Sequence, residues 1–395
     1  MSIPWLIVAG DFALTGGMDS ANYHLAEYLA VHRDTPVTLV AHRVAPPLAN
    51  HPRVTVHKVV RPAGRHLLGE KFLDRAGRRA AAALTASYPE ARILVNGENC
   101  IWPGINWVHL VFHRYGCVDA GAPWWFRLKN QMTRLYHRRR EAHALQASRI
   151  IITNSDTTRR QVIEDVGIEA SRVHRIYLGV DSEQYGPVSE TEREDARTRF
   201  GVAGNAPVLL FVGALGYDAN KGFDTLLTAL PRLRALLEAP VTLLAAGGGA
   251  LAYWRERASS MGLSNFVRFL GHVDCVPALL AAADVLVSPV RYESYGLNVH
   301  EAICRGVPAV VSRSAGVAER YPPELAGLLL NNPEDVEELA QRLANCIRNQ
   351  REYLPHVRRL GDEWLRYSWD SMSAAMVRLI EENIAERGGK AHFAS

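Results

Sequence analysis

Two glutamates separated by seven residues, Glu293 and Glu301, have the setting in this sequence that most clearly suggests chemistry. They flank Gly296, where a predicted strand and loop give way to a predicted helix. The first N–H groups of a helix and its dipole favour negative charge, so this helix start suits a phosphate. A carboxylate beside it can accept hydrogen bonds from hydroxyl groups such as those of a sugar. The plainer alternative is two solvated glutamates flanking a helix.

The first half of the chain supplies elements that can position such groups. Short apolar runs alternate with helix-like segments, and five of these runs are predicted strands: residues 3–9, 37–41, 93–95, 107–109 and 150–153. Continuous apolar strands that alternate with helices indicate a parallel sheet covered on both faces. Residues 180–205 interrupt this rhythm with Gly186-Pro187 and the acid-rich stretch 190–195, which predicts a linker running into a short helix.

The same rhythm then returns in the second half. Strands are predicted at residues 208–212, 242–246, 268–270, 285–287 and 309–311, and a terminal helix at 369–387. We therefore expect an α/β protein of two doubly wound, Rossmann-like domains facing a central cleft, with ligands beyond the carboxyl ends of the strands. The expected division is 1–183, joined by the C-terminal helix 370–395, for the first domain and 184–369 for the second.

Composition limits the class of protein. The 395 residues, 48% hydrophobic and 22% charged, suit a soluble globular chain of two or three domains. Five scattered cysteines without a CxxC pair argue against a disulfide scaffold or a zinc site and favour a reducing, cytoplasmic location. The first residues predict a strand rather than a signal peptide, and no apolar run approaches the roughly 20 residues of a membrane span. A net charge of +4 names no partner, and nucleic acid is not expected.

Several further motifs appear in a fixed order along the chain. They are Gly16-Gly17 with Ala21–Ala26, Ile152–Ser155, Gly179–Asp181, Phe211–Gly213, Lys221–Leu226, Phe269–Val273, the segment Glu293–Pro308 and Ser314–Glu319. Each is weak alone, but the ordered set resembles the retaining glycosyltransferases of family 4, which have the GT-B fold. The resemblance covers nearly the whole chain. It implies transfer of a hexose or deoxyhexose from a nucleotide-diphosphate sugar to a glycan or lipid-linked acceptor, in cell-surface polysaccharide or glycolipid synthesis.

The resemblance also implies roles for individual residues. Glu301 would hold the ribose hydroxyls of the nucleotide, and Glu293 would contact the donor sugar near the reacting centre. Lys221 would neutralise the leaving diphosphate. The remaining donor-side positions are Gly16, Gly17, Gly213, Val273, Gly296 and Leu297. The second domain would thus bind the donor and the first domain the acceptor.

His109 ends the predicted strand 107–109 of the first domain, so it should face the cleft. Its position resembles the active-site histidine of the family, which contacts the donor sugar; a structural or merely exposed histidine is the alternative. The resemblance implies front-face attack with retention, in which the departing phosphate takes the acceptor's proton. The sequence agrees only in lacking an obvious general base, and spacing alone leaves a hydrolase with two carboxylates open.

One position departs from the family pattern. Relatives usually carry an arginine directly after the glycine at position 213, where this chain has Ala214, and the nearby Tyr217 and Asn220 are neutral. Losing a cation from a phosphate site of low dielectric could cost several kcal/mol of leaving-group stabilisation. Another basic residue could replace it, the enzyme could be slower, or the chain could be a pseudo-enzyme.

No metal or other cofactor is expected. The chain has no Asp-x-Asp triplet, which glycosyltransferases of the other major fold use to hold a divalent metal on the diphosphate. Lys221 and a helix N-terminus would do the work of the metal.

An aromatic and basic segment is the candidate acceptor or membrane surface. Trp124 and Trp125 lead into a stretch in which every charged residue up to position 140 is basic. Rings and cations together suit an anionic membrane surface or a polyanion, while a solvated helix face with an aromatic anchor is the alternative. The candidates are His113, Arg114, Trp124, Trp125, Arg138 and Arg139, and the expected location is the cytoplasm, peripheral on the inner face of the membrane.

Other classes of protein stay open. One is a nucleotide-sugar epimerase or a phosphorylase on a related two-domain fold, and an epimerase would consume donor without acceptor. Another is a non-catalytic sugar- or nucleotide-binding scaffold, suggested by Ala214, which would bind nucleotide without turnover. An NAD-dependent oxidoreductase is disfavoured because no G-x-G-x-x-G follows the first strand. The sequence sets neither the base, the sugar, the acceptor nor the oligomeric state.

Overall fold

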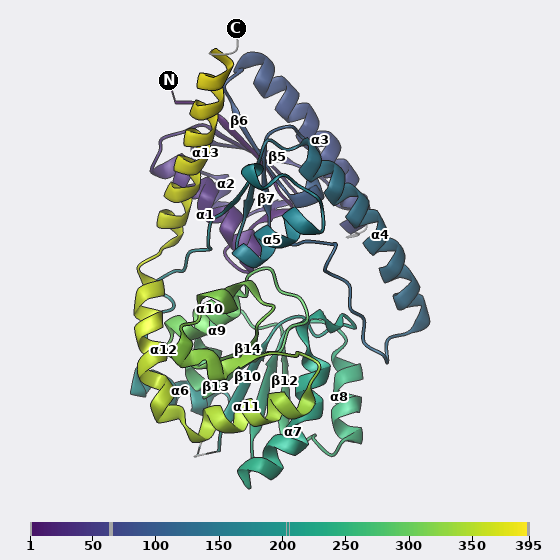
Figure 1. Ribbon diagram of the computed structural model, residues 1–395, viewed down its shortest axis with the longest axis vertical. Coiled ribbons are helices and arrows are strands. Elements are labelled where there is room, and N and C mark those ends of the chain that lie inside the picture. The colour runs from purple at the N-terminus through teal and green to yellow at the C-terminus, as the bar shows by residue number, and fades with distance from the viewer. Residues whose placement is uncertain (1, 63–65, 203, 205, 393–395) are drawn as a thin grey trace. The chain divides into compact units, whose positions relative to one another are not determined.

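The computed structural model describes residues 2–62, 66–202, 204 and 206–392, and its chain forms two compact units (Figure 1). The first unit comprises residues 1–113, 135–179 and 367–395, and the second comprises 114–134 and 180–366. Residues 114–134, which the sequence analysis assigned to the first domain, thus group with the second unit.

A seven-stranded sheet with the order β5-β3-β1-β6-β7-β8-β9 forms the centre of the first unit. Its strands are β1 (Trp5–Val8), β3 (Val37–Ala41), β5 (Val54–Lys58), β6 (Arg92–Asn96), β7 (Ile105–Val108), β8 (Ile150–Thr153) and β9 (Val173–Arg175). All of them pair in parallel, and the short strands β2 (Asp11–Phe12) and β4 (Arg43–Val44) pair beside them. Every residue of β1, β7 and β8 is buried, as expected for a parallel sheet covered on both faces.

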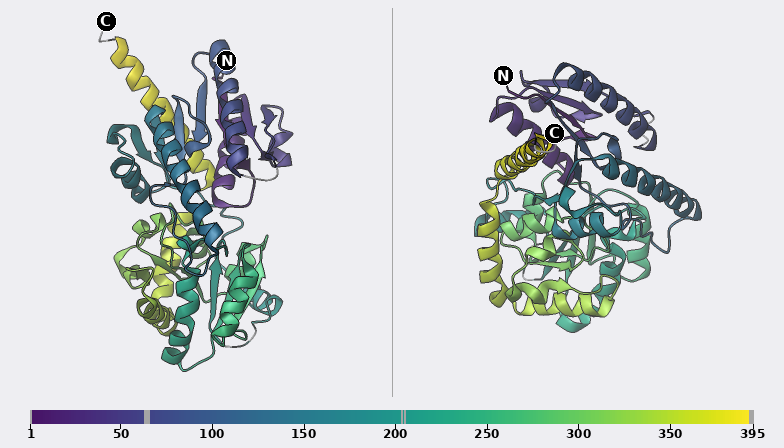
Figure 2. Two further views of the ribbon diagram at one scale, coloured as in Figure 1. Left: turned by 90° about the vertical axis from the view of Figure 1, so that its right-hand side faces the viewer. Right: turned by 45° about the horizontal axis from the view of Figure 1, so that its top comes forward.

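Helices connect these strands and cover the sheet (Figures 1 and 2). They are α1 (Gly17–Val31), α2 (Pro46–Ala49), α3 (His66–Ser87), α4 (Trp124–Ala147), α5 (Asp156–Glu164) and α13 (Trp369–His392). The C-terminal helix α13 runs beside α1, where the rings of His24 and Trp369 stack at 5.0 Å and Arg33 pairs with Glu381 at 2.7 Å. Residues from both ends of the chain thus complete the first unit.

The second unit contains a six-stranded parallel sheet with the order β12-β11-β10-β13-β14-β15. Its strands are β10 (Val208–Val212), β11 (Thr242–Ala246), β12 (Val267–Gly271), β13 (Val285–Ser288), β14 (Ala309–Ser312) and β15 (Leu329–Leu330). Its helices are α6 (Glu190–Arg199), α7 (Phe223–Leu237), α8 (Leu251–Ser260), α9 (Val276–Ala282), α10 (Leu297–Cys304), α11 (Val336–Arg348) and α12 (Gln350–Leu365). Short 3-10 turns are η4 (Ala219–Lys221), η5 (Gly316–Arg320) and η6 (Pro323–Leu328).

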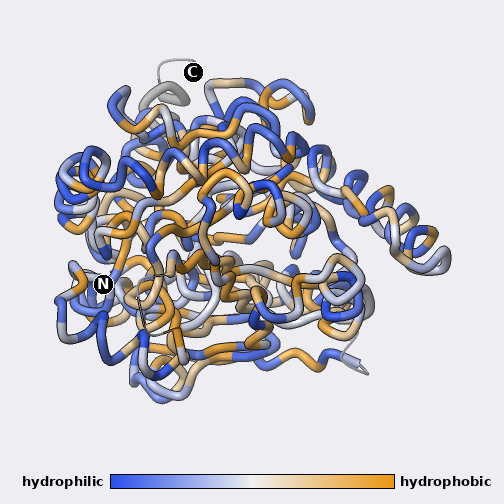
Figure 3. Tube along the Cα trace, turned by 90° about the horizontal axis from the view of Figure 1, so that it is seen from below, coloured by the Kyte–Doolittle hydropathy of each residue, from blue (hydrophilic) through white to orange (hydrophobic). Residues whose placement is uncertain are grey.

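The predicted strands are confirmed, and four of them, 37–41, 150–153, 208–212 and 242–246, have the observed bounds. The sequence analysis missed β2, β4, β5, β9 and β15, which are short or partly exposed elements with a weak apolar signal. The apolar strands lie inside and the helices alternate polar and apolar residues along their length (Figure 3). Two doubly wound sheets result, each with its own core.

Candidate functional site

The order of strands in the second sheet reverses between β10 and β13, which are neighbours in the sheet. At such a point the chain leaves adjacent strands in opposite directions, and a crevice opens beyond their carboxyl ends. Gly213 directly follows β10, and the loop that carries Glu293 follows β13. The sequence motifs around these two residues therefore meet at one edge of the sheet.

Lys221 and Glu293 form an ion pair at this edge, with 2.5 Å between Lys221 Nζ and Glu293 Oε2. The charge of Glu293 raises the pKa of Lys221. Gly222 makes the approach possible, because its backbone has φ +69° and a Cβ atom there would lie 1.8 Å from the carbonyl oxygen of Pro289. The two residues expected to contact the diphosphate and the sugar are thus brought together in the structure.

Arg291 fixes the turn that carries Lys221. Its guanidinium donates two hydrogen bonds of 2.8 Å to the carboxylate of Asp224 and one of 2.7 Å to the carbonyl oxygen of Ala219. Such a bidentate pair restrains geometry more strongly than a point charge would. Arg291 therefore ties η4 and α7 to the loop after β13, a positioning role that the sequence analysis missed.

The helix α10 begins where the sequence predicted, at Leu297 after Gly296. Gly296 has φ +105°, and a Cβ atom there would lie 3.0 Å from Val317 Cγ1, so a larger residue would be strained. Asn298 donates a hydrogen bond of 3.1 Å to the carbonyl oxygen of Val212 and holds the helix start against the end of β10. The first N–H groups of α10, which lack partners within the helix, thus lie at the switch point.

Glu301 lies one turn further along α10 and is hydrogen-bonded to the hydroxyl of Tyr185. Burial raises the pKa of Glu301 to about 8, and the hydrogen bond from Tyr185 opposes this rise only in part. Val273, the expected contact near the base, follows β12 at the same carboxyl edge of the sheet. Tyr185 was missed by the sequence analysis because it lies in the segment interpreted as a linker.

Ala214 is exposed, and the loop around it packs on the glycine-rich turn after β11. Leu215 N donates to the carbonyl oxygen of Gly248 at 2.9 Å, and Gly213 N donates to that of Ala246 at 3.0 Å. Asn220 is fully buried and accepts a hydrogen bond from Cys117 N at 3.2 Å, so it holds the loop in place. Arg291, the arginine beside η4, is engaged by Asp224 and does not take over the missing charge.

A pocket of about 260 Å³ occupies the corresponding switch point of the first sheet, between β1 and β6. Segments that follow five strands line it, together with the first turn of α1 and part of α3. Gly16 and Gly17 lie where α1 begins, and Met18 and Asp19 of its first turn face the pocket. The glycine loop predicted from the sequence thus directly precedes two residues that line this pocket.

His109 lines the pocket directly after β7. Burial lowers the pKa of His109 to about 3, so the imidazole is neutral at physiological pH. Its ring lies 4.4 Å from that of Trp107, and its buried Nε2 atom has no hydrogen-bond partner in the described part of the chain. A buried polar atom without a partner facing a pocket is available to a ligand.

His113 pairs with a carboxylate of α4. Its Nδ1 atom lies 2.6 Å from the carboxylate of Glu141, which also accepts a hydrogen bond of 2.8 Å from Phe112 N. Burial raises the pKa of Glu141 to about 8. His113 thus has a structural partner on α4, which the sequence analysis did not foresee.

The pocket also carries acidic residues that the sequence analysis missed. Asp11 pairs with Arg43 at 3.3 Å and with Arg61 at 3.4 Å. Burial, followed by the charge of Asp11, raises the pKa of Asp19 to about 6. No short motif marked these residues, because the sheet brings them together from separate loops.

The remaining candidates lie on or before α4. Arg114 is exposed in the second unit, as are Trp124 and Trp125, which retain 76% and 52% of their surface. Arg139 is exposed and Arg138 is half-buried in the part of α4 that belongs to the first unit. Among the described helices, none combines the length and the apolar character that a transmembrane segment requires.

Comparison with known proteins agrees with this geometry. The solved structure of HepE from Anabaena in complex with UDP-glucose superimposes with a TM-score of 0.70 at 20% identity, covering 97% of this chain and all of that one. Two doubly wound domains, each with a site at the switch point of its own sheet, define the GT-B fold. A sequence model described as Glycosyltransferase Family 4 matches residues 15–184, and one described as Glycosyl transferases group 1 matches residues 206–349. The chain belongs to the family 4 glycosyltransferases, as the sequence analysis expected.

Two curated relatives are similar over part of their length. Mannosylfructose-phosphate synthase of Agrobacterium fabrum is 31% identical over 233 residues, which cover 56% of this chain and 50% of that protein. A GDP-mannose-dependent alpha-(1-6)-phosphatidylinositol monomannoside mannosyltransferase of Mycobacterium tuberculosis is 29% identical over 220 residues, which cover 53% and 56%. The chain thus spans about half the length of these curated relatives.

Proposed function

We propose that this protein is a retaining glycosyltransferase that moves a hexose or deoxyhexose from a nucleotide-diphosphate sugar to a glycan or lipid-linked acceptor. The observation that carries the proposal is the Lys221–Glu293 pair at the start of α10. A cation, helix N–H groups and a carboxylate there suit a diphosphate joined to a sugar. The relatives support this class, because one is named a GDP-mannose-dependent mannosyltransferase and the other a mannosylfructose-phosphate synthase.

Each group on the second domain has a place in this proposal. Lys221 and the N–H groups of Gly296 and Leu297 stabilise the negative charge that develops on the departing diphosphate. Glu293 accepts hydrogen bonds from the donor sugar, and Glu301 accepts them from the ribose hydroxyls. Gly213 leaves room for the diphosphate, and Val273 packs near the base.

The transfer step needs no separate protein base. The bond between the anomeric carbon and the phosphate oxygen breaks, and the acceptor oxygen bonds to the same face of that carbon. The departing phosphate takes the proton of the acceptor hydroxyl, so charge and atoms balance. His109 is a neutral hydrogen-bonding partner for the donor sugar in this scheme, consistent with its low pKa and unpaired Nε2 atom.

We also propose that activation of the diphosphate is independent of metal. Lys221 supplies a full positive charge and α10 a partial one, and together they would take the role that a divalent ion has in glycosyltransferases of the other major fold. Two other functions are alternatives to sugar transfer. A non-catalytic nucleotide-sugar-binding scaffold is suggested by Ala214, and a GT-B nucleotide-sugar epimerase would consume donor without acceptor.

A peripheral association with an anionic membrane on the cytoplasmic side extends the proposal. The helix α4 exposes apolar side chains four, four and three residues apart, at Trp124, Leu128, Met132 and Leu135, each at least 52% exposed. This spacing places them along one face of the helix. Exposed cations on the same helix, such as Lys129 and Arg139, add attraction to anionic lipid.

Nucleotide binding and turnover test the proposal together. Thermal shift with UDP, GDP, dTDP and ADP in the presence of EDTA should show stabilisation by at least one nucleotide at millimolar concentration. The corresponding nucleotide sugar should then release that nucleotide only when an acceptor is added. Binding without turnover would favour the scaffold, and donor consumption without acceptor would favour the epimerase.

A further inference from the structure

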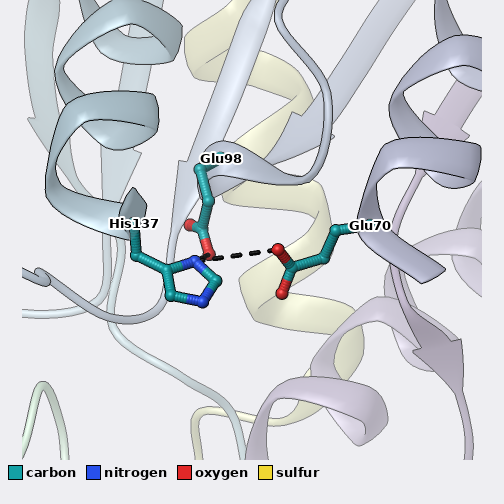
Figure 4. A group of neighbouring side chains, drawn as sticks. All are labelled: Glu70, Glu98 and His137. Carbon is teal, nitrogen blue, oxygen red and sulfur yellow. Dashed lines mark ion pairs between the residues drawn. The ribbon is translucent and has the colours of Figure 1, made fainter. Parts of the chain in front are cut away.

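Three side chains with metal-binding atoms gather at the wall of the first-domain pocket (Figure 4). Glu70 comes from α3, Glu98 from the turn after β6, and His137 from α4. His137 Nδ1 lies 3.3 Å from Glu98 Oε1 and 3.7 Å from Glu70 Oε2, and one potential ligand atom from each residue lies within 4.8 Å of the others. Nothing in the proposed sugar transfer uses these residues.

The cluster is buried and leaves polar atoms unsatisfied. The side chain of His137 is 7% exposed, those of Glu98 and Glu70 are 13% and 15% exposed, and Figure 4 shows the imidazole nitrogen pointing at both carboxylates. Neither His137 Nδ1 nor Glu70 Oε2 makes a hydrogen bond within the described residues. The two atoms form an ion pair at 3.7 Å without a hydrogen bond, so a ligand that contacts both would satisfy buried polar atoms that lack one.

The two arginines near the carboxylates, Arg61 and Arg140, pair with other aspartates, Asp11 and Asp74. Arg140 donates to the carbonyl oxygen of Glu98 at 2.9 Å and lies 3.8 Å from Asp74. Within the described part of the chain, neither Glu70 nor Glu98 forms an ion pair with a lysine or arginine. A divalent cation between the two carboxylates would balance their negative charge.

The distances fit an ion between these residues. Histidine nitrogen and carboxylate oxygen bind zinc at about 2.0–2.2 Å, so two ligands at a tetrahedral angle lie about 3.3–3.6 Å apart. The separations of 3.3 Å and 3.7 Å from His137 Nδ1 are close to this range. One imidazole and two carboxylates suit Zn²⁺ or another first-row divalent ion better than Mg²⁺, which prefers oxygen ligands and water.

We propose that Glu70, Glu98 and His137 bind a divalent transition-metal ion at the wall of the first-domain pocket. Three protein ligands leave a coordination position open, and Glu70 and Glu98 line the pocket, so an oxygen atom of a bound molecule can complete the coordination. This site lies in the first unit, apart from the Lys221–Glu293 pair of the second unit. The inference goes beyond the proposed sugar transfer and does not require it.

Metal titration of the full-length protein, freed of affinity tag and treated with EDTA, tests the site. Isothermal titration calorimetry with Zn²⁺ should show one ion bound per chain, and competition with Mn²⁺ should be visible by electron paramagnetic resonance. Glu70→Gln and Glu98→Gln keep the shape of the side chain and should each weaken Zn²⁺ binding at least tenfold. His137→Asn should do the same, and circular dichroism of the metal-free variants checks their fold.

Glu27→Gln is the matched control. It removes a carboxylate that lies 3.3 Å from His24 Nδ1 on α1, a pair without a third nearby ligand. This variant should bind Zn²⁺ like the wild type. Absence of stoichiometric binding to the wild type, or equal binding by the folded Glu70→Gln and Glu98→Gln variants, would overturn the proposal. The titration contains no nucleotide or sugar, so its failure leaves the transferase proposal untouched, and failure of turnover leaves the metal site untouched.

Discussion

Lys221 and Glu293 neutralise each other across 2.5 Å at the carboxyl edge of the second sheet. The pair unites a turn after β10 with a loop after β13, and both groups were expected to contact the same donor. A diphosphate that binds Lys221 must therefore compete with Glu293 for the ammonium group. Because of this competition, substituting each residue in turn should change nucleotide binding and turnover in different ways.

Glu293→Gln should strengthen binding of the nucleoside diphosphate while it lowers turnover. The amide no longer holds Lys221, so we expect affinity to rise about three- to tenfold, which is about 0.7–1.4 kcal/mol. Turnover should fall at least tenfold because a hydrogen-bond acceptor for the donor sugar is weakened. Calorimetry with the nucleotide that gives the largest thermal shift, and a nucleotide-release assay, measure the two effects.

The comparison variants are Lys221→Met and Glu334→Gln. Lys221→Met should weaken nucleotide binding at least tenfold, since a cation is lost from the phosphate site. Glu334 pairs with Arg291 at 2.8 Å and is exposed, so its substitution changes the net charge equally but leaves Lys221 unchanged. If Glu293→Gln weakened nucleotide binding as much as Lys221→Met does, the expectation that Glu293 and the diphosphate compete for Lys221 would be wrong.

Ala214→Arg should restore a cation beside the diphosphate. Ala214 is exposed, so a longer side chain has room, and we expect a gain in nucleotide affinity of about three- to tenfold at low salt. The gain should shrink as salt rises, because exposed charges are screened. Ala214→Gln controls for side-chain length and should show no salt-dependent gain; an equal gain in both variants would contradict the electrostatic explanation.

Glu301→Gln should stabilise the ligand-free protein at alkaline pH. The pKa of Glu301 is about 8 in the folded protein against an ordinary value of 4.5, so folding favours the protonated carboxyl. The stability that this proton provides is present below pH 4.5 and is lost as pH rises towards 8. At pH 9 the variant should therefore melt at a higher temperature than the wild type, by about 2–4 °C for each kcal/mol of destabilisation that the substitution removes. At pH 4.5 the two proteins should melt at the same temperature.

Two measurements accompany this substitution. Nucleotide affinity should fall in Glu301→Gln, because the amide is a weaker acceptor for the ribose hydroxyls. Glu194→Gln changes an exposed glutamate of α6 and should leave the pH dependence of melting as in the wild type. If the melting temperatures of Glu301→Gln and the wild type differed by the same amount at pH 4.5 and pH 9, the carboxyl of Glu301 would not cause the pH dependence of melting.

Vesicle binding tests the exposed face of α4. The protein should cosediment with anionic vesicles at low salt and less at high salt, while neutral vesicles should bind weakly. Replacing Arg138 and Arg139 by alanine should weaken binding at least tenfold, at about 1 kcal/mol for each cation near the surface. Trp124→Ala with Trp125→Ala should also weaken it, and Arg351→Ala on α12 serves as a control. Absence of binding at low salt would rule out the association.

The sequence by itself determined the strands, the two doubly wound domains and the family. Apolar runs such as 208–212 and 242–246 predict buried parallel strands because the signal is local. The helix start at Gly296 was equally predictable, since glycine and the apolar positions that follow it mark the boundary. The candidate residues Lys221, Glu293 and Glu301 came from short ordered motifs and lie at the expected edge of the sheet.

The tertiary structure alone decided which side chains meet. Arg291 pairs with Asp224 from a separate loop, and Glu141 pairs with His113, which the sequence analysis had named as a candidate for the acceptor or membrane surface. Glu70 and His137 lie inside basic stretches 67 positions apart, and their neighbours in sequence give no sign of a shared site. Contacts of this kind depend on the order of parallel strands, which places the ends of distant segments at one edge and which no local pattern of residues encodes.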